Sequence, residues 1–166
     1  MKIMDLIRET SQHALNRRRT FRFEIDLTDN AVLIIDENEA DPDILLKSIP
    51  IEPAGVLRMQ VAPSGGIGRP DPPNYPAAIF ATDSIGHVKG SETVINHMVW
   101  AIRFRSDGSV VNDANLPVSA TLFVYPSGSS ASDTPTDKQQ VRAMTIYGGS
   151  GAVRYWKYNG TAFSAN

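Results

Sequence analysis

Two carboxylates on one short segment, Glu24 and Asp26, are the residues whose types and spacing best suit chemistry. They lie two positions apart in an alternating stretch, so a strand points both side chains to the same face. Paired carboxylates can act as a general acid and a general base. Charged side chains on the solvent face of a strand are far more common. We therefore interpret Glu24 and Asp26 as exposed strand charges, with acid–base chemistry as the alternative.

An acidic run from residue 36 to residue 43 holds the other concentration of carboxylates. A Ca²⁺ ion takes several carboxylate and carbonyl oxygens, and an EF-hand loop needs a glycine at position 6 and a glutamate at position 12. This run has neither residue in those places, and acidic runs are usually solvated. We predict a solvated loop, with a calcium site as the alternative. The acidic residues of the run are Asp36, Glu37, Glu39, Asp41 and Asp43.

The remaining candidates for catalysis or metal binding lack the expected patterns. His13, His87 and His97 have no second ligand at the spacing of HxH or HExxH. The chain has no cysteine, which excludes disulfides, thiolate metal sites and a cysteine nucleophile. No GxSxG elbow marks a serine nucleophile. We therefore predict no catalytic residue, no metal, no cofactor and no small-molecule substrate, and we expect that the protein is not an enzyme.

Three consecutive arginines, Arg17, Arg18 and Arg19, are the candidate contacts to a phosphate backbone. Cations at the C-terminal end of a helix also complement the helix dipole, and most charge runs are solvated. The formal net charge of −2 gives the chain no general attraction to nucleic acid. We interpret the run as a solvated helix end, with nucleic-acid contact as the alternative.

A helix is predicted over residues 3–15, because one stripe of side chains recurs there at helical spacing. A helix this short is marginal alone, so it needs packing against the rest of the protein or an extension upstream. No residue that typically caps a helix precedes Ile3. We expect a helix cut from a longer one, with a frayed end as the alternative. The stripe consists of Ile3, Leu6, Ile7, Thr10, Ala14 and Leu15.

The central strand is predicted over residues 98–104, where Trp100, Ile102 and Phe104 take alternate positions. A turn should follow, because Asp107 can bond the backbone two residues on and Gly108 tolerates a positive φ. Seven further strands are predicted from alternation, or from apolar runs bounded by turn residues. They cover residues 20–27, 31–35, 44–51, 56–61, 118–125, 140–147 and 152–158.

One helix followed by about eight strands, without βαβ alternation, predicts an α+β fold with one N-terminal α-helix packed on antiparallel β-sheets. The length suits a single domain, residues 1–166, with the helix at 1–17 and a β-rich head at 18–166. Two long loops interrupt the head. Residues 62–90 are rich in proline and glycine, and the serine-rich residues 126–137 are expected to be disordered or highly exposed.

Three segments resemble the GspH/FimT-type family of minor pseudopilins and type IV minor pilins. Residues 5–26 (DLIRETSQHALNRRRTFRFEID) are similar to the family's helix end, basic stretch and first strand. Residues 101–110 (AIRFRSDGSV) resemble its hydrophobic-x-Phe-x-x-x-Gly strand and turn, and residues 144–156 (MTIYGGSGAVRYW) resemble its closing hairpin. The resemblance spans both ends of the chain and implies a pilin-like fold, in which the two long loops are additions.

The resemblance implies a structural function without catalysis. In this family a hydrophobic N-terminal helix follows a cleaved leader, anchors in the bacterial inner membrane and then packs in the core of a filament. The β-rich head lies in the periplasm or outside the cell, and contacts other pilin or pseudopilin subunits. Such a subunit belongs to a type II secretion pseudopilus or to a type IV pilus. On this interpretation, the hydrophobic half of the helix is missing upstream of Met1.

Some minor pilins of this group bind DNA during its uptake, through arginines of a Gly-Arg-x-Arg motif near the C-terminus. At the corresponding turn this chain has Ala152 in place of the first arginine, so only Arg154 carries over. Losing one cation weakens the affinity for phosphate. The alternative function is therefore a DNA- or ligand-binding β-rich module. It would use Arg154 together with Arg17, Arg18, Arg19, Arg103 and Arg105.

A third hypothesis is an enzyme or a carbohydrate-binding domain with a tryptophan platform. Trp100 and Trp156 are the two tryptophans of the chain. A platform has to be exposed, whereas the place of Trp100 in the central strand favours core packing. The hypothesis therefore loses its residues if both side chains are buried.

Overall fold

The computed structural model describes residues 2–37, 43–51, 57–70, 80–82, 86–112, 114–128 and 133–165. They form one α-helix, thirteen strands and one short 3-10 helix. The helices are α1 (Lys2–Arg17) and η1 (Lys138–Gln140). The strands are β1 (Thr20–Asp26), β2 (Ala31–Glu37), β3 (Ile44–Pro50), β4 (Leu57–Gln60), β5 (Ala81–Thr82), β6 (His87–Lys89), β7 (Glu92–Val94), β8 (Met98–Phe104), β9 (Val110–Val111), β10 (Ala120–Pro126), β11 (Arg142–Ile146), β12 (Val153–Tyr158) and β13 (Phe163–Ala165).

The predicted helix is confirmed as α1, and its stripe faces the protein except at Leu15, which is 47% exposed. Leu6, Ile7 and Ala14 are buried, and the hydroxyl of Thr10 donates to the carbonyl oxygen of Leu6 at 2.8 Å. After Arg17, Arg18 takes a left-handed conformation with a φ of 54°. The backbone N–H of Arg19 then donates to the carbonyl oxygen of Ala14 at 3.3 Å. This bond belongs to a Schellman motif, so the basic run forms the C-terminal cap of the helix.

The larger of two sheets has the strand order β5-β8-β1-β2-β3-β6-β7, with β9 added beside β8. Strand β1 lies between β2 and the central strand β8, and it pairs with both in antiparallel fashion along nearly its whole length. The turn predicted after β8 is confirmed, since Asp107 accepts from the backbone N–H of Ser109 at 2.9 Å and Gly108 has a φ of 84°. The sheet is mixed, because β3 and β6 pair in parallel at Ile44 and Val88.

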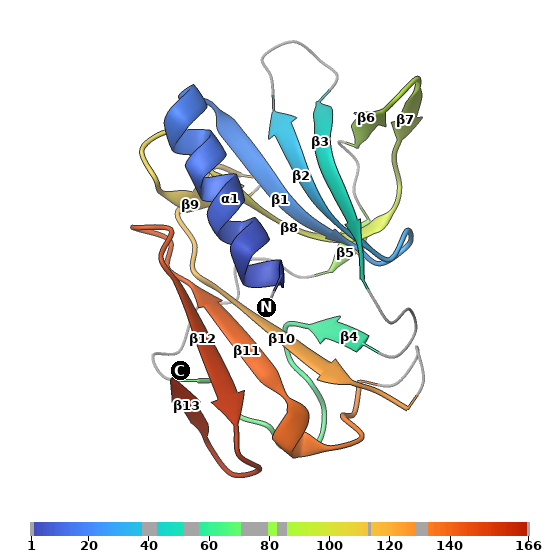
Figure 1. The fold of residues 1–166 in the computed structure, drawn as a ribbon, viewed down its shortest axis with the longest axis vertical. Coiled ribbons are helices and arrows are strands. Elements are labelled where there is room, and N and C mark those ends of the chain that lie inside the picture. Colours follow the sequence, from blue (N-terminus) through green and yellow to red (C-terminus); the bar gives the residue numbers. More distant parts are fainter. Residues whose placement is uncertain are drawn as a thin grey trace.

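The second sheet has the order β13-β12-β11-β10-β4 and is antiparallel. Figure 1 shows α1 lying along one face of the large sheet, with the second sheet below it. The helix and the two sheets share one main core. This core contains Phe21, Phe23, Ile25, Trp100, Ile102, Phe104, Leu122, Val124, Met144 and Ile146.

The expected α+β class was wrong. The described part of the chain is mostly β, with a curled mixed sheet and a second sheet against one α-helix. The expected number of about eight strands was also wrong, although every segment predicted as a strand contains one. The five additional strands, β5, β6, β7, β9 and β13, have two or three residues each. Such strands are too short for an alternating pattern and form by pairing with distant segments.

Where the structure describes them, the first expected loop contains strands, and the second is mostly exposed, as predicted, with its two ends held together. The stretch 62–90 contributes β5 and β6 to the large sheet. In the stretch 126–137, Ser127 bridges to Pro135, and the backbone N–H of Thr136 donates to the carbonyl oxygen of Pro126 at 3.1 Å. Residues 129–132 of this stretch lie outside the described residues.

Candidate functional site on the polar face of β1

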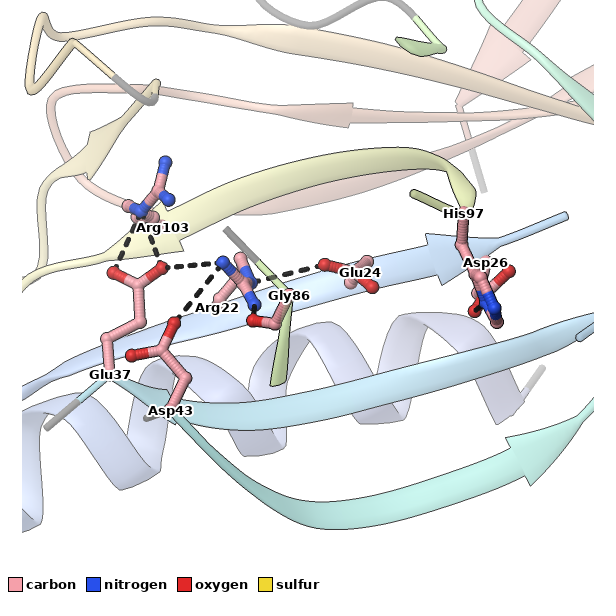
Figure 2. Close-up of polar contacts among 8 residues, drawn as sticks. All are labelled: Arg22, Glu24, Asp26, Glu37, Asp43, Gly86, His97 and Arg103. Carbon is pink, nitrogen blue, oxygen red and sulfur yellow. Dashed lines mark hydrogen bonds and ion pairs between the residues drawn. The ribbon is translucent and has the colours of Figure 1, made fainter. Parts of the chain in front are cut away.

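The polar face of β1 is buried, which the sequence did not predict. Phe21, Phe23 and Ile25 face the main core, so the alternate side chains of β1 must point to the other side of the sheet. Those side chains belong to Arg22, Glu24 and Asp26, and each residue is at most 1% exposed. The interpretation of Glu24 and Asp26 as exposed strand charges was therefore wrong. Figure 2 shows two polar groups along this face, one around Arg22 and one around Asp26.

Arg22 is the centre of the first group. Its Nε lies 3.1 Å from Glu24 Oε2, and its Nη1 lies 3.3 Å from Glu37 Oε1 and 3.4 Å from Asp43 Oδ2. Its Nη2 donates to the carbonyl oxygen of Gly86 at 2.7 Å. The guanidinium group thus joins β1 and β2 to the segments that begin β3 and β6 (Figure 2).

Arg103 of β8 completes this group. Its Nε donates to both carboxylate oxygens of Glu37, at 2.6 and 2.8 Å. Two guanidinium groups therefore face three carboxylates, those of Glu24, Glu37 and Asp43. Separating the strands would leave these buried charges uncompensated, which is costly. The ion pairs therefore favour the observed arrangement of the strands. We call these five residues the arginine network.

The arginine network also accounts for the acidic run. Glu37 and Asp43 belong to it, and Asp36 lies 3.7 Å from Arg17 Nη1. The prediction of a solvated loop was wrong for these three carboxylates, because each forms an ion pair with an arginine. A calcium site would need their oxygens as ligands instead. Glu39 and Asp41 lie outside the described residues.

The second group joins Asp26, Asp29 and His97. Asp26 Oδ1 accepts from the backbone N–H groups of Thr28 and Asp29, at 2.8 and 2.9 Å. His97 Nδ1 donates to Asp26 Oδ2 at 2.6 Å and lies 3.9 Å from Asp29 Oδ1. The hydrogen bond to Asp26 raises the pKa of His97, and the charges of the nearby carboxylates act in the same direction, against partial desolvation.

Sequence reasoning missed this second group because His97 lies 71 residues from Asp26. The signal available was the turn itself. Asp26, Thr28 and Asp29 fall where a hairpin turn needs side chains that bond the backbone. Nothing local in the sequence shows which distant residue this turn meets. That contact depends on the antiparallel pairing of β1 with β8, which places Asp26 opposite Val99, near His97.

Two of the arginines expected to contact nucleic acid, Arg17 and Arg154, each lie against an aromatic ring. Arg17 stacks over the ring of Phe21 at 5.7 Å. Arg154 lies between Val153 and Tyr155, which pack against the main core, so it points to the opposite face of the second sheet. There its guanidinium group stacks over Trp156 at 5.4 Å. The structure therefore does not join Arg154 to the cap of α1 in one basic surface.

Both tryptophans are buried, which removes the platform hypothesis. Trp100 is fully buried and packs edge-on against Phe23, with ring centroids 6.3 Å apart. Trp156 is 6% exposed, and its Nε1–H donates to the hydroxyl of Thr145 at 2.9 Å. Each ring is held by the fold and presents no open face of the kind that a sugar needs.

Comparisons with protein-family models, with curated proteins and with solved structures find no match for this chain. Its function therefore has to be argued from its own residues. The arginine network can fix strands in place, and the group at Asp26 can hold a proton or a cation.

Proposed function

We propose that the chain is the head of a filament subunit of the minor pilin or pseudopilin type, which assembles through its N-terminal helix. The observation that carries this proposal is the position of α1. This first element of the chain packs against β1, β2 and β8 of the large sheet and against β12 of the second sheet. A force or a docking contact on this helix is therefore transmitted to both sheets of the head.

The outer face of α1 supports the same proposal. Asp5, Arg8 and Gln12 are exposed there, one turn apart along the helix. The buried stripe lies on the other side, so the helix can hold the head and still contact a neighbour. In this proposal the neighbours are other pilin or pseudopilin subunits, of a type II secretion pseudopilus or of a type IV pilus.

The proposal includes a structural role without catalysis. Glu24, the carboxylate that sequence reasoning offered as an acid or a base, belongs to the arginine network. Its neighbour Asp26 fixes the turn after β1 through two backbone hydrogen bonds. The burial of both carboxylates is therefore explained by a structural role.

The proposal also includes a place in the cell, which is the bacterial inner membrane for the anchor and the periplasm or the exterior for the head. Among the residues that the structure describes, no helix has the length and apolar character to cross a membrane. The proposed anchor is a hydrophobic stretch encoded upstream of Met1. A spanning helix takes about 20 consecutive apolar residues.

The first test is the genomic sequence ahead of the codon for Met1. The proposal expects an open reading frame that continues upstream and encodes this apolar stretch after a short leader that ends in glycine. An in-frame stop codon directly before Met1, with no such stretch, contradicts the proposal.

A second test uses the absence of cysteine from the chain. A single cysteine in place of the exposed Gln12, labelled with maleimide-benzophenone, should give photo-cross-links to another subunit when the full-length protein is irradiated in the cells that carry its gene. The matched control is a cysteine in place of Thr161, which is exposed in the turn between β12 and β13, away from α1 (Figure 1). Cross-linking that is equal at both positions, or absent at Gln12, contradicts assembly through α1.

A further inference from the structure

Asp26, Asp29 and His97 bring three metal-ligating atoms together at the end of β1. One oxygen from each carboxylate and one ring nitrogen all lie within 4.8 Å of one another. In the described part of the chain, this is the one group of three or more such residues. The donors come from both ends of a turn and from the segment that leads into β8, so the fold and not the local sequence assembles them.

Two of the three ligand side chains are fixed in position by the fold, and the third is exposed enough to move toward an ion. Asp26 is fully buried, and its Oδ1 is fixed by two backbone N–H groups, so only Oδ2 faces the group. The segment of His97 is tied to the same turn, because the backbone N–H of Met98 donates to the hydroxyl of Thr28 at 2.9 Å. The side chain of Asp29 is 40% exposed and can adjust.

The distances allow a small divalent ion after small movements of two side chains. Zn²⁺ binds nitrogen and carboxylate oxygen at about 2.0–2.2 Å in a tetrahedral arrangement, so neighbouring donors around it lie roughly 3.4 Å apart. The distance of 2.6 Å between His97 Nδ1 and Asp26 Oδ2 is that of a hydrogen bond, so the imidazole has to move back by about 0.8 Å. The distance of 3.9 Å from Nδ1 to Asp29 Oδ1 needs a shift of about 0.5 Å by the exposed carboxylate.

One positive charge opposes a cation here. Lys89 Nζ lies 3.4 Å from Asp29 Oδ2, and both side chains are more than one-third exposed. An ion pair this exposed is worth little and reorganises readily. A metal ion bound to Asp29 Oδ1 has to replace the proton on His97 Nδ1, while this ammonium lies against the other oxygen of Asp29.

We propose that Asp26, Asp29 and His97 bind a divalent transition-metal ion of the Zn²⁺ type. His97 contributes Nδ1, each aspartate contributes one carboxylate oxygen, and water completes the coordination. Imidazole together with carboxylate suits Zn²⁺ better than Ca²⁺ or Mg²⁺, which prefer oxygen donors alone. The bound ion would join the β1–β2 turn to the start of β8. This inference is independent of the filament role.

The test is isothermal titration of the whole chain with ZnCl₂ at mildly alkaline pH, after treatment with a chelator and removal of that chelator. The expected result is one binding event per chain. His97→Ala and Asp29→Asn should each weaken it by at least about tenfold, since even an outer-sphere partner contributes that much. Circular dichroism spectra should show that both variants are folded.

The matched control is His13→Ala. His13 also has a carboxylate near its ring, since its Nε2 lies 3.7 Å from Glu9 Oε1 one turn back on α1. This variant should keep the affinity of the original chain. The proposal is overturned if no heat of binding is detected, if folded His97→Ala and Asp29→Asn variants bind as before, or if His13→Ala alone abolishes binding.

Discussion

Arg22 and Arg103 lie directly opposite each other on β1 and β8, and the carboxylate of Glu37 contacts both guanidinium groups. Like charges at such a pairing destabilise a sheet. Glu37 therefore acts as the counter-ion that lets two buried arginines occupy adjacent strands. Among the carboxylates of the arginine network, its loss should lower the free energy of unfolding most.

Glu37→Gln should lower the free energy of unfolding by about 3 kcal/mol, because it leaves two buried cations without their shared carboxylate. The measurement is urea denaturation followed by tryptophan fluorescence. The control is Glu92→Gln, which changes an exposed carboxylate on β7 and should cost no more than about 0.5 kcal/mol. Equal losses from the two variants would show that the arginine network does not stabilise the fold.

Two adjacent glycines of the closing hairpin should differ strongly in how well they tolerate alanine. A Cβ atom on Gly148 would overlap the carbonyl oxygen of Val118, whereas a Cβ on Gly149 meets nothing within 4 Å. Gly148→Ala should therefore destabilise the protein by several kcal/mol or prevent folding, since backbone has to move. Gly149→Ala should change stability by about 0.5 kcal/mol or less. Thermal melts of both variants, side by side, test this difference.

The hydrogen bond between Trp156 and Thr145 can be tested with a matched pair of variants. Thr145→Val keeps the shape of the side chain but leaves the buried indole N–H without its acceptor, which should cost about 1–3 kcal/mol. Thr145→Ser keeps the hydroxyl and should lose less. Denaturant midpoints that rank valine at or above serine would show that this bond does not contribute.

Burial raises the pKa of Tyr125 from 10.0 to about 12, and the nearby Asp133 acts in the same direction. The phenol is neutral in both states below pH 10, so its contribution to stability is complete there. Above pH 10 the unfolded chain loses this proton first, and the contribution disappears as the pH rises toward 12. Urea midpoints measured across this interval should fall less steeply for Tyr125→Phe than for the original chain.

The sequence predicted the long elements well because their patterns are local. Trp100 and Phe104 alternate with shorter or charged residues, and Leu6 and Ile7 recur at helical spacing. The partners of those elements were harder to predict. The parallel contact of Ile44 with Val88 joins a strand to a three-residue strand that has no pattern of its own. The class was misjudged because short strands of this kind add to the β content, so the described chain is mostly β.

The candidate sites were predicted less well than the fold, because burial on the second face of a sheet is not visible in one strand. Arg22, Glu24 and Asp26 look like the solvent face of an amphipathic strand. The surroundings of Arg22 come from Glu37, from Asp43 and from the segment at Gly86, and those of Asp26 come from His97 and the turn after β1, which meet only in the folded sheet. The same argument explains why His97 gave no signal.

The burial of both faces of β1 has a consequence for folding accuracy. If β1 shifted by one residue between β2 and β8, its aromatic and aliphatic side chains would exchange places with a guanidinium group and two carboxylates. Three charges would then enter the apolar interior, and the salt bridges to Glu37 and Asp43 would be lost at the same time. A shifted pairing of this strand therefore costs both the burial of charges and the loss of salt bridges. The charged side of β1 thus helps to fix the register of the sheet.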